Sequence, residues 1–205
     1  MASPRQVVHD FIEKTYKVKL FSIGDFVITG IRGAVPDGNG DIIPSKNEFN
    51  KYDDTVGWLK ADERLFMRGT VEPGKKYTVA PMNVNGAFYL KEGLYLACRA
   101  KHFGKDAFNI YAKYPKGKVE GWRDTARKGA PDKTKIFYDG TGIDIHAGSN
   151  NIDNIDGWSA GCQVIYGDWN STAWREFKEP LYKSKQNSFL YCLLNYNDIS
   201  TELEK

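Results

Sequence analysis

Two short segments near the C-terminal end of the chain carry the residue types of an acyl-transfer site. The segment IDIHAG contains His146, and sixteen positions later the segment WSAGCQ contains Cys162. A cysteine thiolate is a strong nucleophile, and a nearby imidazole can take the thiol proton and later return it. The pair therefore predicts a nucleophile, Cys162, with its base, His146. Each residue also has a structural alternative, namely a surface or structural histidine and a buried, small apolar cysteine.

An acidic residue lies beside the histidine in the same run. In an extended strand alternate side chains share a face, so Asp144 and His146 are expected on one side and Ile143 and Ile145 on the other. Residues two apart on a strand lie about 6.5 Å apart at the backbone, within reach of a hydrogen bond or one water. We therefore expect Asp144, or else a backbone carbonyl, to orient the imidazole of His146.

The residues before the cysteine are small. Ser159, Ala160 and Gly161 allow a tight backbone turn next to Cys162. Such a turn can aim the N–H groups of Gly161 and Cys162 at one point, where they would stabilise an oxyanion and lower the pKa of the thiol. Ser159 and Gly161 are therefore predicted to belong to the catalytic segment.

Several polar or aromatic side chains next to strands and loops are candidates for holding a substrate. Arg123 in the segment GWRD is preferred, because a guanidinium binds a carboxylate through two hydrogen bonds. Trp158 directly precedes the SAGC turn, where it could cover the site, stack on a sugar or belong to the core. The remaining candidates are Arg32, Gln163, Asp53, Asp54 and Asp124.

This arrangement resembles the catalytic segment of the L,D-transpeptidase (YkuD-like) cysteine enzymes, which act on peptidoglycan. The shared letters are a strand ending in I-x-I-H, a loop rich in Gly, Ser and Asn, and then S-x-G-C. More narrowly, IDIHAG followed by WSAGCQVI is similar to a subgroup found in bacterial and phage proteins. The resemblance implies a base at His146 and a nucleophile at Cys162, and Ser159 and Gly161 match the remaining letters. This chain has Ala160 where the family usually has a histidine.

The residues and the resemblance together predict cysteine-dependent acyl transfer on the stem peptides of peptidoglycan. If water accepts the acyl group, the protein is a peptidase or lysin. If an amino group of a second stem accepts it, the protein is a transpeptidase. We expect the first. A second hypothesis is a wall-binding or virion module that has the fold without turnover. A third is a metallohydrolase using Asp144, His146 and Cys162, with His102 as a further ligand, although neither HExxH nor paired-cysteine spacing occurs. Under the first hypothesis no cofactor or metal is expected.

The composition is that of a folded domain with an ordinary charged surface. Hydrophobic residues make up 41% and charged residues 27% of the 205 residues, and no low-complexity run divides them, so one domain is expected over 1–205. A net charge of +3 is too small to indicate a nucleic-acid partner. Three cysteines without C-x-x-C spacing indicate neither a disulfide framework nor a zinc knuckle, and Cys98 and Cys192 are assigned to the core.

The N-terminal segment carries charges where a signal peptide needs an apolar core, and no apolar run approaches the length of a membrane span. We therefore expect synthesis in the cytoplasm and action at the cell wall only after delivery, by a phage particle or on lysis.

The pattern of apolar residues predicts a mostly β (α+β) fold, and the resemblance implies a YkuD-like sandwich. Residues 4–17 have apolar side chains at helical spacing after Ser3, which predicts an N-terminal helix within 1–18. Residues 19–112 are expected to be the β-rich part. Residues 20–31 are expected to form a strand pair or a bulged strand, and residues 58–112 alternate short apolar runs, 76–82 among them, with Gly- and Pro-containing turns, which is typical of a β-meander. The β-rich part is interrupted by a long irregular loop over 33–54.

The C-terminal half contains the catalytic segment, 136–181. A polar loop with at most one helical turn is expected before it, over 114–131. A helix is predicted over 171–181, with Trp169, Trp174 and Phe177 as its apolar anchors. The apolar run 188–196 is expected to be a buried strand.

Overall fold

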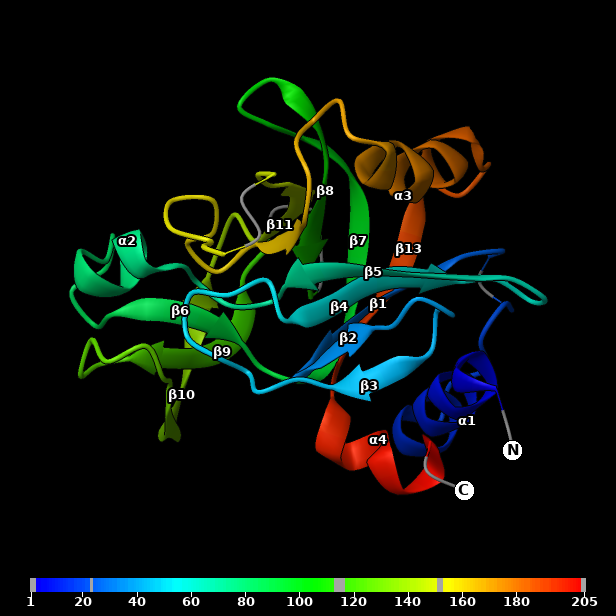
Figure 1. Cartoon of the computed structure of the whole chain (residues 1–205), viewed down its shortest axis with the longest axis horizontal. Coiled ribbons are helices and arrows are strands. Elements are labelled where there is room, and N and C mark those ends of the chain that lie inside the picture. The colour runs from blue at the N-terminus through cyan, green and yellow to red at the C-terminus, as the bar shows by residue number, and fades with distance from the viewer. Residues whose placement is uncertain (1–2, 23, 113–116, 151–152, 204–205) are drawn as a thin grey trace.

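An eight-stranded sheet that closes into a barrel lies at the centre of the molecule (Figure 1). The computed structural model describes residues 3–22, 24–112, 117–150 and 153–203. Around the barrel the strands follow the order β1 (Val27–Arg32), β13 (Ser188–Asn195), β7 (Gly93–His102), β8 (Lys105–Tyr111), β11 (Asp144–Ala147), β12 (Gln163–Ile165), β5 (Arg64–Thr70) and β4 (Asp54–Leu59). The pairs β1–β13 and β11–β12 are parallel, and the other neighbours run antiparallel.

Apolar side chains fill the interior of the barrel. They occur at alternate positions of the strands, such as Phe108 and Ile110 on β8 and Ile145 and Ala147 on β11. Because successive side chains of a strand point to opposite faces, the residues between them point away from this core. Burial of this apolar surface is the main favourable contribution to the stability of the fold.

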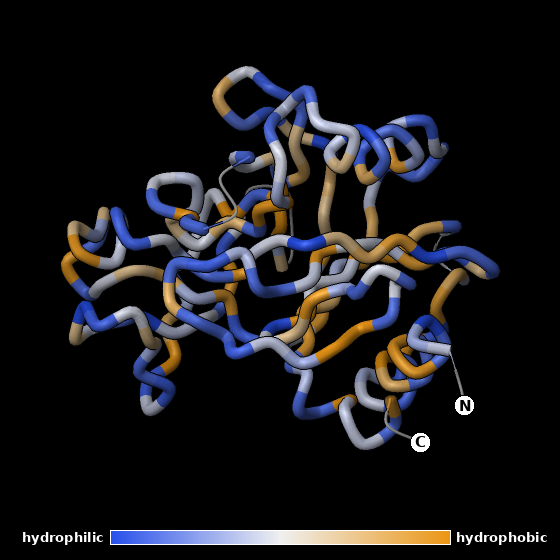
Figure 2. The backbone as a smooth tube through the Cα atoms, viewed as in Figure 1, coloured by the Kyte–Doolittle hydropathy of each residue, from blue (hydrophilic) through white to orange (hydrophobic). Residues whose placement is uncertain are grey.

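Two helices cover the outer face of part of the barrel. Helix α1 (Pro4–Tyr16) begins after Ser3, whose Oγ accepts a hydrogen bond from the amide of Gln6, and it packs against α4 (Tyr196–Leu203). Leu190, Cys192 and Leu194 of β13 belong to a second apolar cluster under these helices, whereas Phe189, Tyr191 and Leu193 belong to the core of the barrel. Both faces of β13 are therefore buried between its two end residues. Figure 2 shows hydrophobic residues along the barrel strands and on α1.

A smaller sheet stands beside the barrel, on the left in Figure 1. It pairs β10 (Asp132–Gly140) with β9 (Val119–Asp124) and β9 with β6 (Ala87–Leu90), and the short helix α2 (Lys75–Val79) lies next to it. A two-stranded ribbon joins β2 (Ala34–Pro36) to β3 (Ile42–Pro44). The remaining helix, α3 (Thr172–Lys183), contributes Trp174, Phe177 and Leu181 to the core of the barrel.

The prediction of a mostly β fold with a few helices is confirmed. The helix expected within 1–18 is α1, the helix expected over 171–181 is α3, and the buried run 188–196 contains β13. The YkuD-like sandwich is not confirmed, since the main sheet closes into a barrel.

Three local predictions are wrong. Residues 76–82 were expected to form a strand, but they include most of α2, because backbone amides at its start donate to Ser159, Asp156 and Asn50 from distant segments. The loop expected over 114–131 contains β9, which is paired on both sides; residues 114–116 lie outside the described residues. The loop expected over 33–54 contains β2 and β3.

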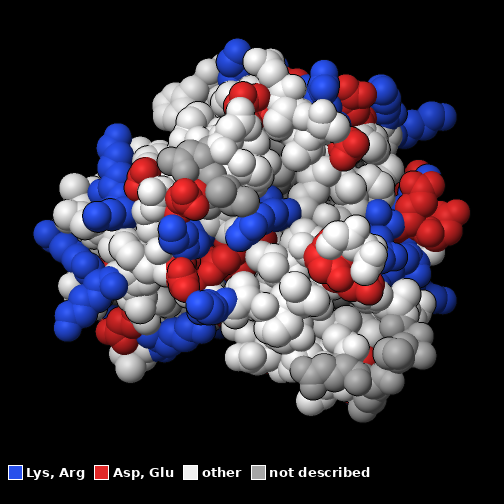
Figure 3. Space-filling model, in the orientation of Figure 1, with Lys and Arg blue, Asp and Glu red and all other residues white. Residues whose placement is uncertain are grey.

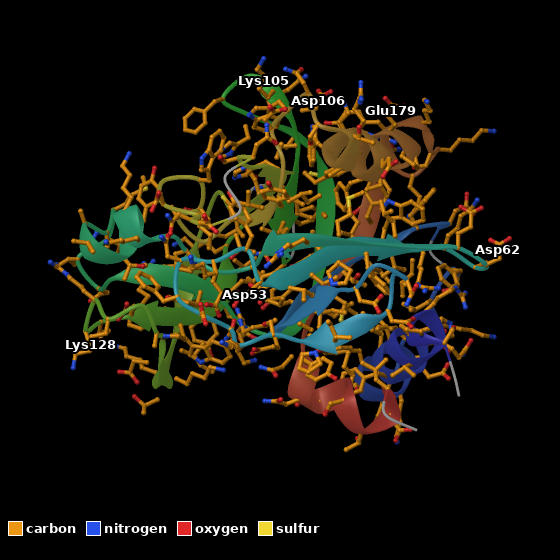
Figure 4. All side chains as sticks on the ribbon, in the orientation of Figure 1. Asp53, Asp62, Lys105, Asp106, Lys128 and Glu179 are labelled. Atoms are coloured by element: carbon orange, nitrogen blue, oxygen red, sulfur yellow. The ribbon has the colours of Figure 1, made fainter. Side chains whose placement is uncertain are left out.

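None of the helices in the described ranges is both long and apolar enough to cross a membrane. On the face drawn in Figure 3, Lys and Arg side chains are scattered and interrupted by acidic groups. Asp53, labelled in Figure 4, lies near the middle of this face. Charge of this kind is typical of an ordinary protein surface.

Replacing Ser171 with alanine is expected to lower the stability of the protein by about 1 kcal/mol, because its side chain accepts the Trp174 amide at the start of α3. Differential scanning calorimetry should show a fall of about 2–4 °C in the thermal midpoint. Thr201→Ala, at an exposed position of α4, is the control and should stay within about 0.5 kcal/mol of the wild type. Equal midpoints for the two variants would contradict the capping role.

Candidate active site

Strand β11 carries Asp144 and His146 on one side. Its neighbours Ile145 and Ala147 belong to the barrel core, whereas His102 contacts both Asp144 and His146. The predicted alternation along this segment is therefore confirmed. β11 is held between β8 and β12, so the backbone that carries these side chains is hydrogen bonded on both edges.

A tight turn places Cys162 directly before β12. The hydroxyl of Ser159 accepts from the amide of Gly161 at 3.1 Å and donates to the carbonyl of Cys162 at 2.8 Å, which ties the turn together. Gly161 has a φ of 131°, and a Cβ atom there would lie 2.6 Å from the carbonyl oxygen of Phe88. The turn therefore requires glycine at this position. Since the Gly161 amide already has an acceptor, the oxyanion role predicted for it requires that this hydrogen bond be shared or broken.

The structure brings the predicted nucleophile and base together. The Sγ of Cys162 lies within 4.8 Å of a ring nitrogen of His146. Nδ1 of His146 bonds to the carbonyl oxygen of Ala147 at 2.7 Å, and because a carbonyl only accepts, Nδ1 carries the proton. Nε2 of the neutral ring is thus an acceptor, and it is buried without a hydrogen-bond partner among the described residues. Catalytic pairs in unliganded structures are often longer than a hydrogen bond.

Asp144 does not orient His146. The imidazole is instead oriented by the backbone carbonyl of Ala147, the alternative that the sequence left open. The two carboxylate oxygens of Asp144 bond to Nδ1 of His102 at 2.9 Å and to Nδ2 of Asn109 at 2.9 Å. The carboxylate is therefore committed to a different histidine.

Burial keeps the resting pair uncharged. It lowers the pKa of His146 to about 4, with a further lowering from His102, and it raises the pKa of the Cys162 thiol to about 12. The thiol accepts a weak hydrogen bond from the Asp144 amide at 3.5 Å and lies 3.6 Å from the carbonyl oxygen of Gly142. At neutral pH the pair is a thiol beside a neutral imidazole, so the proton would have to move as the sulfur attacks.

His102 is a member of the site whose contacts the sequence did not predict. It ends β7, and the residues that follow, Phe103 and Gly104, both have positive φ, 48° and 80°, as a type I′ hairpin turn requires. Lys105, labelled on this hairpin in Figure 4, is its partner across the turn. The imidazole stacks on His146 with ring centroids 4.1 Å apart and an angle of 12° between the planes. The HFGKD turn marks the hairpin, but no local pattern connects it with β11.

Trp169 covers the other side of His146. Its ring lies 5.8 Å from the imidazole at an angle of 18°, so the imidazole is stacked between Trp169 and His102. The sequence assigned Trp169 to the core only. Trp174 and Phe177, its companions in that prediction, are buried in the core.

One nitrogen from each histidine and the sulfur of Cys162 all lie within 4.8 Å of one another, a spacing at which a metal ion could be held. A bound metal lies near the plane of each imidazole that ligates it, because the lone pair is in that plane. The two rings are nearly parallel and stacked, so a single ion would require one ring to rotate. As they stand, the stacked rings do not present their lone pairs to one common metal position.

A pocket of about 450 Å³ opens in front of the thiol. Its wall includes Cys162, His102, Phe88, Arg123, Asp139 and Trp158. Cys162 is 6% exposed and lines this pocket, whereas His146 is 1% exposed and is not part of the pocket wall as described.

The candidate substrate residues divide into two groups. Trp158 is 40% exposed at the pocket, and Arg123 lines the pocket but donates to Asp139 and to the Gly86 carbonyl. In the part of the chain that the structure describes, two other candidates do not line this pocket. Arg32 pairs with the partly buried Glu72 and Glu92, and Gln163 donates to the Gly161 carbonyl and accepts from the Tyr191 hydroxyl.

The acidic candidates have structural partners. Asp53 accepts the amide of Glu48, and Asp54 accepts the amides of Gly33 and Val71. Asp124 accepts the amides of Lys128 and Gly129, which fixes the turn after β9. None of these three carboxylates lines the pocket as it is described.

A scan against protein-family models and searches of curated proteins and solved structures found no match to this chain.

Acidification is expected to destabilise the protein through His146. In the unfolded chain this histidine has its ordinary pKa of 6.5, whereas burial in the folded protein lowers its pKa to about 4. Between these values the unfolded state binds more protons, so stability falls as pH falls, by up to about 3 kcal/mol. Urea titrations at several pH values should show a smaller fall in His146→Gln than in the wild type. His9→Gln, in α1, is the matched control, and parallel curves for the wild type and His146→Gln would contradict the expectation.

Proposed function

We propose that this protein is a cysteine-dependent acyl-transfer enzyme that acts on the stem peptides of peptidoglycan, with hydrolysis as its main reaction. The observation that carries the proposal is a thiol at a pocket of about 450 Å³ with a ring nitrogen of His146 within 4.8 Å, in a buried ring whose Nε2 has no hydrogen-bond partner among the described residues. The substrate class rests on the resemblance of the segments around His146 and Cys162 to the L,D-transpeptidase enzymes, whose YkuD-like fold we also propose for the catalytic part. Such an enzyme would act at the cell wall after delivery, by a phage particle or on lysis.

The proposed reaction begins with attack of the Cys162 sulfur on an amide carbonyl in the pocket. As the S–C bond forms, the thiol proton passes to Nε2 of His146. The carbonyl oxygen becomes an oxyanion, which the amide of Cys162 would stabilise. Collapse breaks the C–N bond, releases the amine with a proton and leaves a thioester on Cys162. Water then attacks the thioester, gives up a proton and restores the thiol.

The molecule that accepts the acyl group from Cys162 decides whether the enzyme is a hydrolase or a transpeptidase. Water yields a free carboxylate, whereas an amino group of a second stem yields a new cross-link. Hydrolysis comes first in the proposal because water needs no second binding site in addition to the pocket.

A second candidate is a wall-binding or virion module without turnover, and one observation favours it. Burial raises the pKa of the Cys162 thiol to about 12, so the thiolate is scarce at neutral pH unless His146 accepts the proton. Alkylation with iodoacetamide at neutral pH, followed by peptide mass analysis, tests this point. Cys98, which is half-buried, provides the internal reference. Labelling of Cys162 slower than that of Cys98 would support the module.

Digestion of purified peptidoglycan by the protein, with the products identified by mass, tests the proposed function directly. The expected result is release of fragments with one new carboxyl end in the stem peptide. New cross-linked dimers would identify a transpeptidase. Sedimentation of the intact protein with peptidoglycan in the absence of any product would replace the enzyme with the binding module, and neither products nor binding would remove peptidoglycan as the substrate.

A further inference from the structure

His102 is the histidine that faces the pocket. It lines the pocket together with Cys162, and its side chain is 20% exposed, whereas His146 is 1% exposed and is not part of the pocket wall as described. A leaving amine in the pocket can therefore approach His102 directly. His146 is buried outside the described pocket wall and is not open to such an approach.

The contacts of His102 are those of an oriented proton donor. Nδ1 bonds to Oδ2 of Asp144, and Oδ1 of the same carboxylate accepts from Asn109. The carboxylate fixes the orientation of the ring. Asn109 lies directly opposite Asp144 in the β8–β11 pairing, so the strand register sets the whole chain of hydrogen bonds.

The two histidines are too close for both to be charged. Their ring centroids are 4.1 Å apart, and like charges at this distance repel strongly away from water. His102 has a carboxylate in contact, whereas Nδ1 of His146 faces a neutral carbonyl and its Nε2 faces no partner in the described structure. The other charged groups of the pocket wall, Arg123 and Asp139, pair with each other. A single positive charge on the pair therefore belongs on His102.

We propose that His102 is a second catalytic residue, which donates the proton to the leaving amine, and that Asp144 and Asn109 are its positioning residues. The inference rests on the proposed function and adds to it a division of labour between the two histidines.

The protons balance over one cycle. In acylation the S–C bond forms, and His102 gives its proton to the amine nitrogen in the same step in which His146 takes the thiol proton. The C–N bond then breaks and the amine leaves. The charge has then moved from His102 to His146, so the two rings are never charged together. In deacylation His102 takes a proton from the attacking water in the same step in which His146 gives its proton to the sulfur, and the C–S bond then breaks.

A comparison of two leaving groups tests the inference. Nitrophenolate leaves p-nitrophenyl acetate without a proton, whereas the amine of a stem peptide cannot. His102→Gln should therefore lower peptidoglycan turnover by about 100-fold but leave the acylation burst with p-nitrophenyl acetate within about threefold of wild type. Asp144→Asn should act in the same direction, and His146→Gln should lose both reactions. Equal losses of both reactions in His102→Gln, or no loss of either, would overturn the inference alone.

A spectroscopic measurement on the same proteins does not depend on turnover. The ¹⁵N chemical shifts of histidine-labelled protein at neutral pH should show both nitrogens of His102 protonated in the wild type and only one in Asp144→Asn. His146 should be neutral in both. A neutral His102 in the wild type would overturn the inference even in an active enzyme. Absence of both the burst and peptidoglycan products in the wild type would instead remove the proposed function, and the role of His102 with it.

Discussion

Replacing Cys162 with alanine is expected to lower the turnover of peptidoglycan by at least about a thousandfold, because it removes the only atom that can form the thioester. The fold should be retained. The sulfur makes only long contacts, 3.5 Å to the Asp144 amide and 3.6 Å to the Gly142 carbonyl, and it lies at a pocket where the loss of one atom opens no closed cavity. Turnover and the thermal midpoint should be measured on the same preparation.

Cys192→Ala is the matched control. This cysteine is fully buried in the core under α1 and α4, so its replacement should cost about 1 kcal/mol of stability and leave turnover unchanged. Cys98 is only half-buried, contrary to its assignment to the core, and Cys98→Ala should cost less. Full turnover in Cys162→Ala would exclude it as the nucleophile. Similar losses of turnover in all three variants would indicate an effect on the fold.

Arg32→Met is expected to destabilise the protein by about 3 kcal/mol at neutral pH, because it removes the buried counter-ion of two largely buried carboxylates, Glu72 and Glu92. Arg32 is 4% exposed, and its guanidinium pairs with Glu72 at 3.0 Å and with Glu92, and donates to the Leu90 carbonyl. The loss should shrink in acid, where the two carboxyl groups take up protons. Urea titrations at neutral and acid pH measure both effects.

Two further measurements separate stability from binding in this variant. The double variant Arg32→Met with Glu72→Gln should recover part of the lost stability, because one of the uncompensated charges is gone. Turnover per folded molecule should be unchanged, since Arg32 lies outside the pocket wall as described. A variant with normal stability and reduced turnover would instead restore Arg32 to the substrate candidates that the sequence suggested.

The parts of the site that are local in sequence could be predicted. Alternation along IDIHAG placed Asp144 and His146 on one face, and the small residues before Cys162 indicated the turn that now holds it at the pocket. Helices α1 and α3 could also be predicted, because each sequence has apolar residues along a single helical face and an N-cap residue before it.

The parts that depend on pairing between distant strands could not be predicted. Asp144 contacts His102 because β8 separates β7 from β11 in a particular register, and nothing in either segment specifies that register. Arg32 and Gln163 looked like substrate ligands, since charged and amide side chains are usually exposed, but partners from other strands satisfy them in the interior. The charged residues of the segment GWRD suggested an exposed loop. Arg123 instead pairs with Asp139 of the neighbouring strand β10 within the small sheet.

The position of β13 between β1 and β7 has a consequence for the order in which the chain can assemble. During synthesis, a chain that has emerged only as far as Lys183 already contains both histidines and the nucleophile, but its β1 and β7 still present unpaired backbone edges. Open edges of this kind invite pairing with other chains. The ring of strands closes only when residues 188–195 arrive. We therefore expect a truncated chain ending before Ser188 to aggregate. β13, although it contains none of the proposed catalytic residues, should then determine how much folded protein a cell obtains.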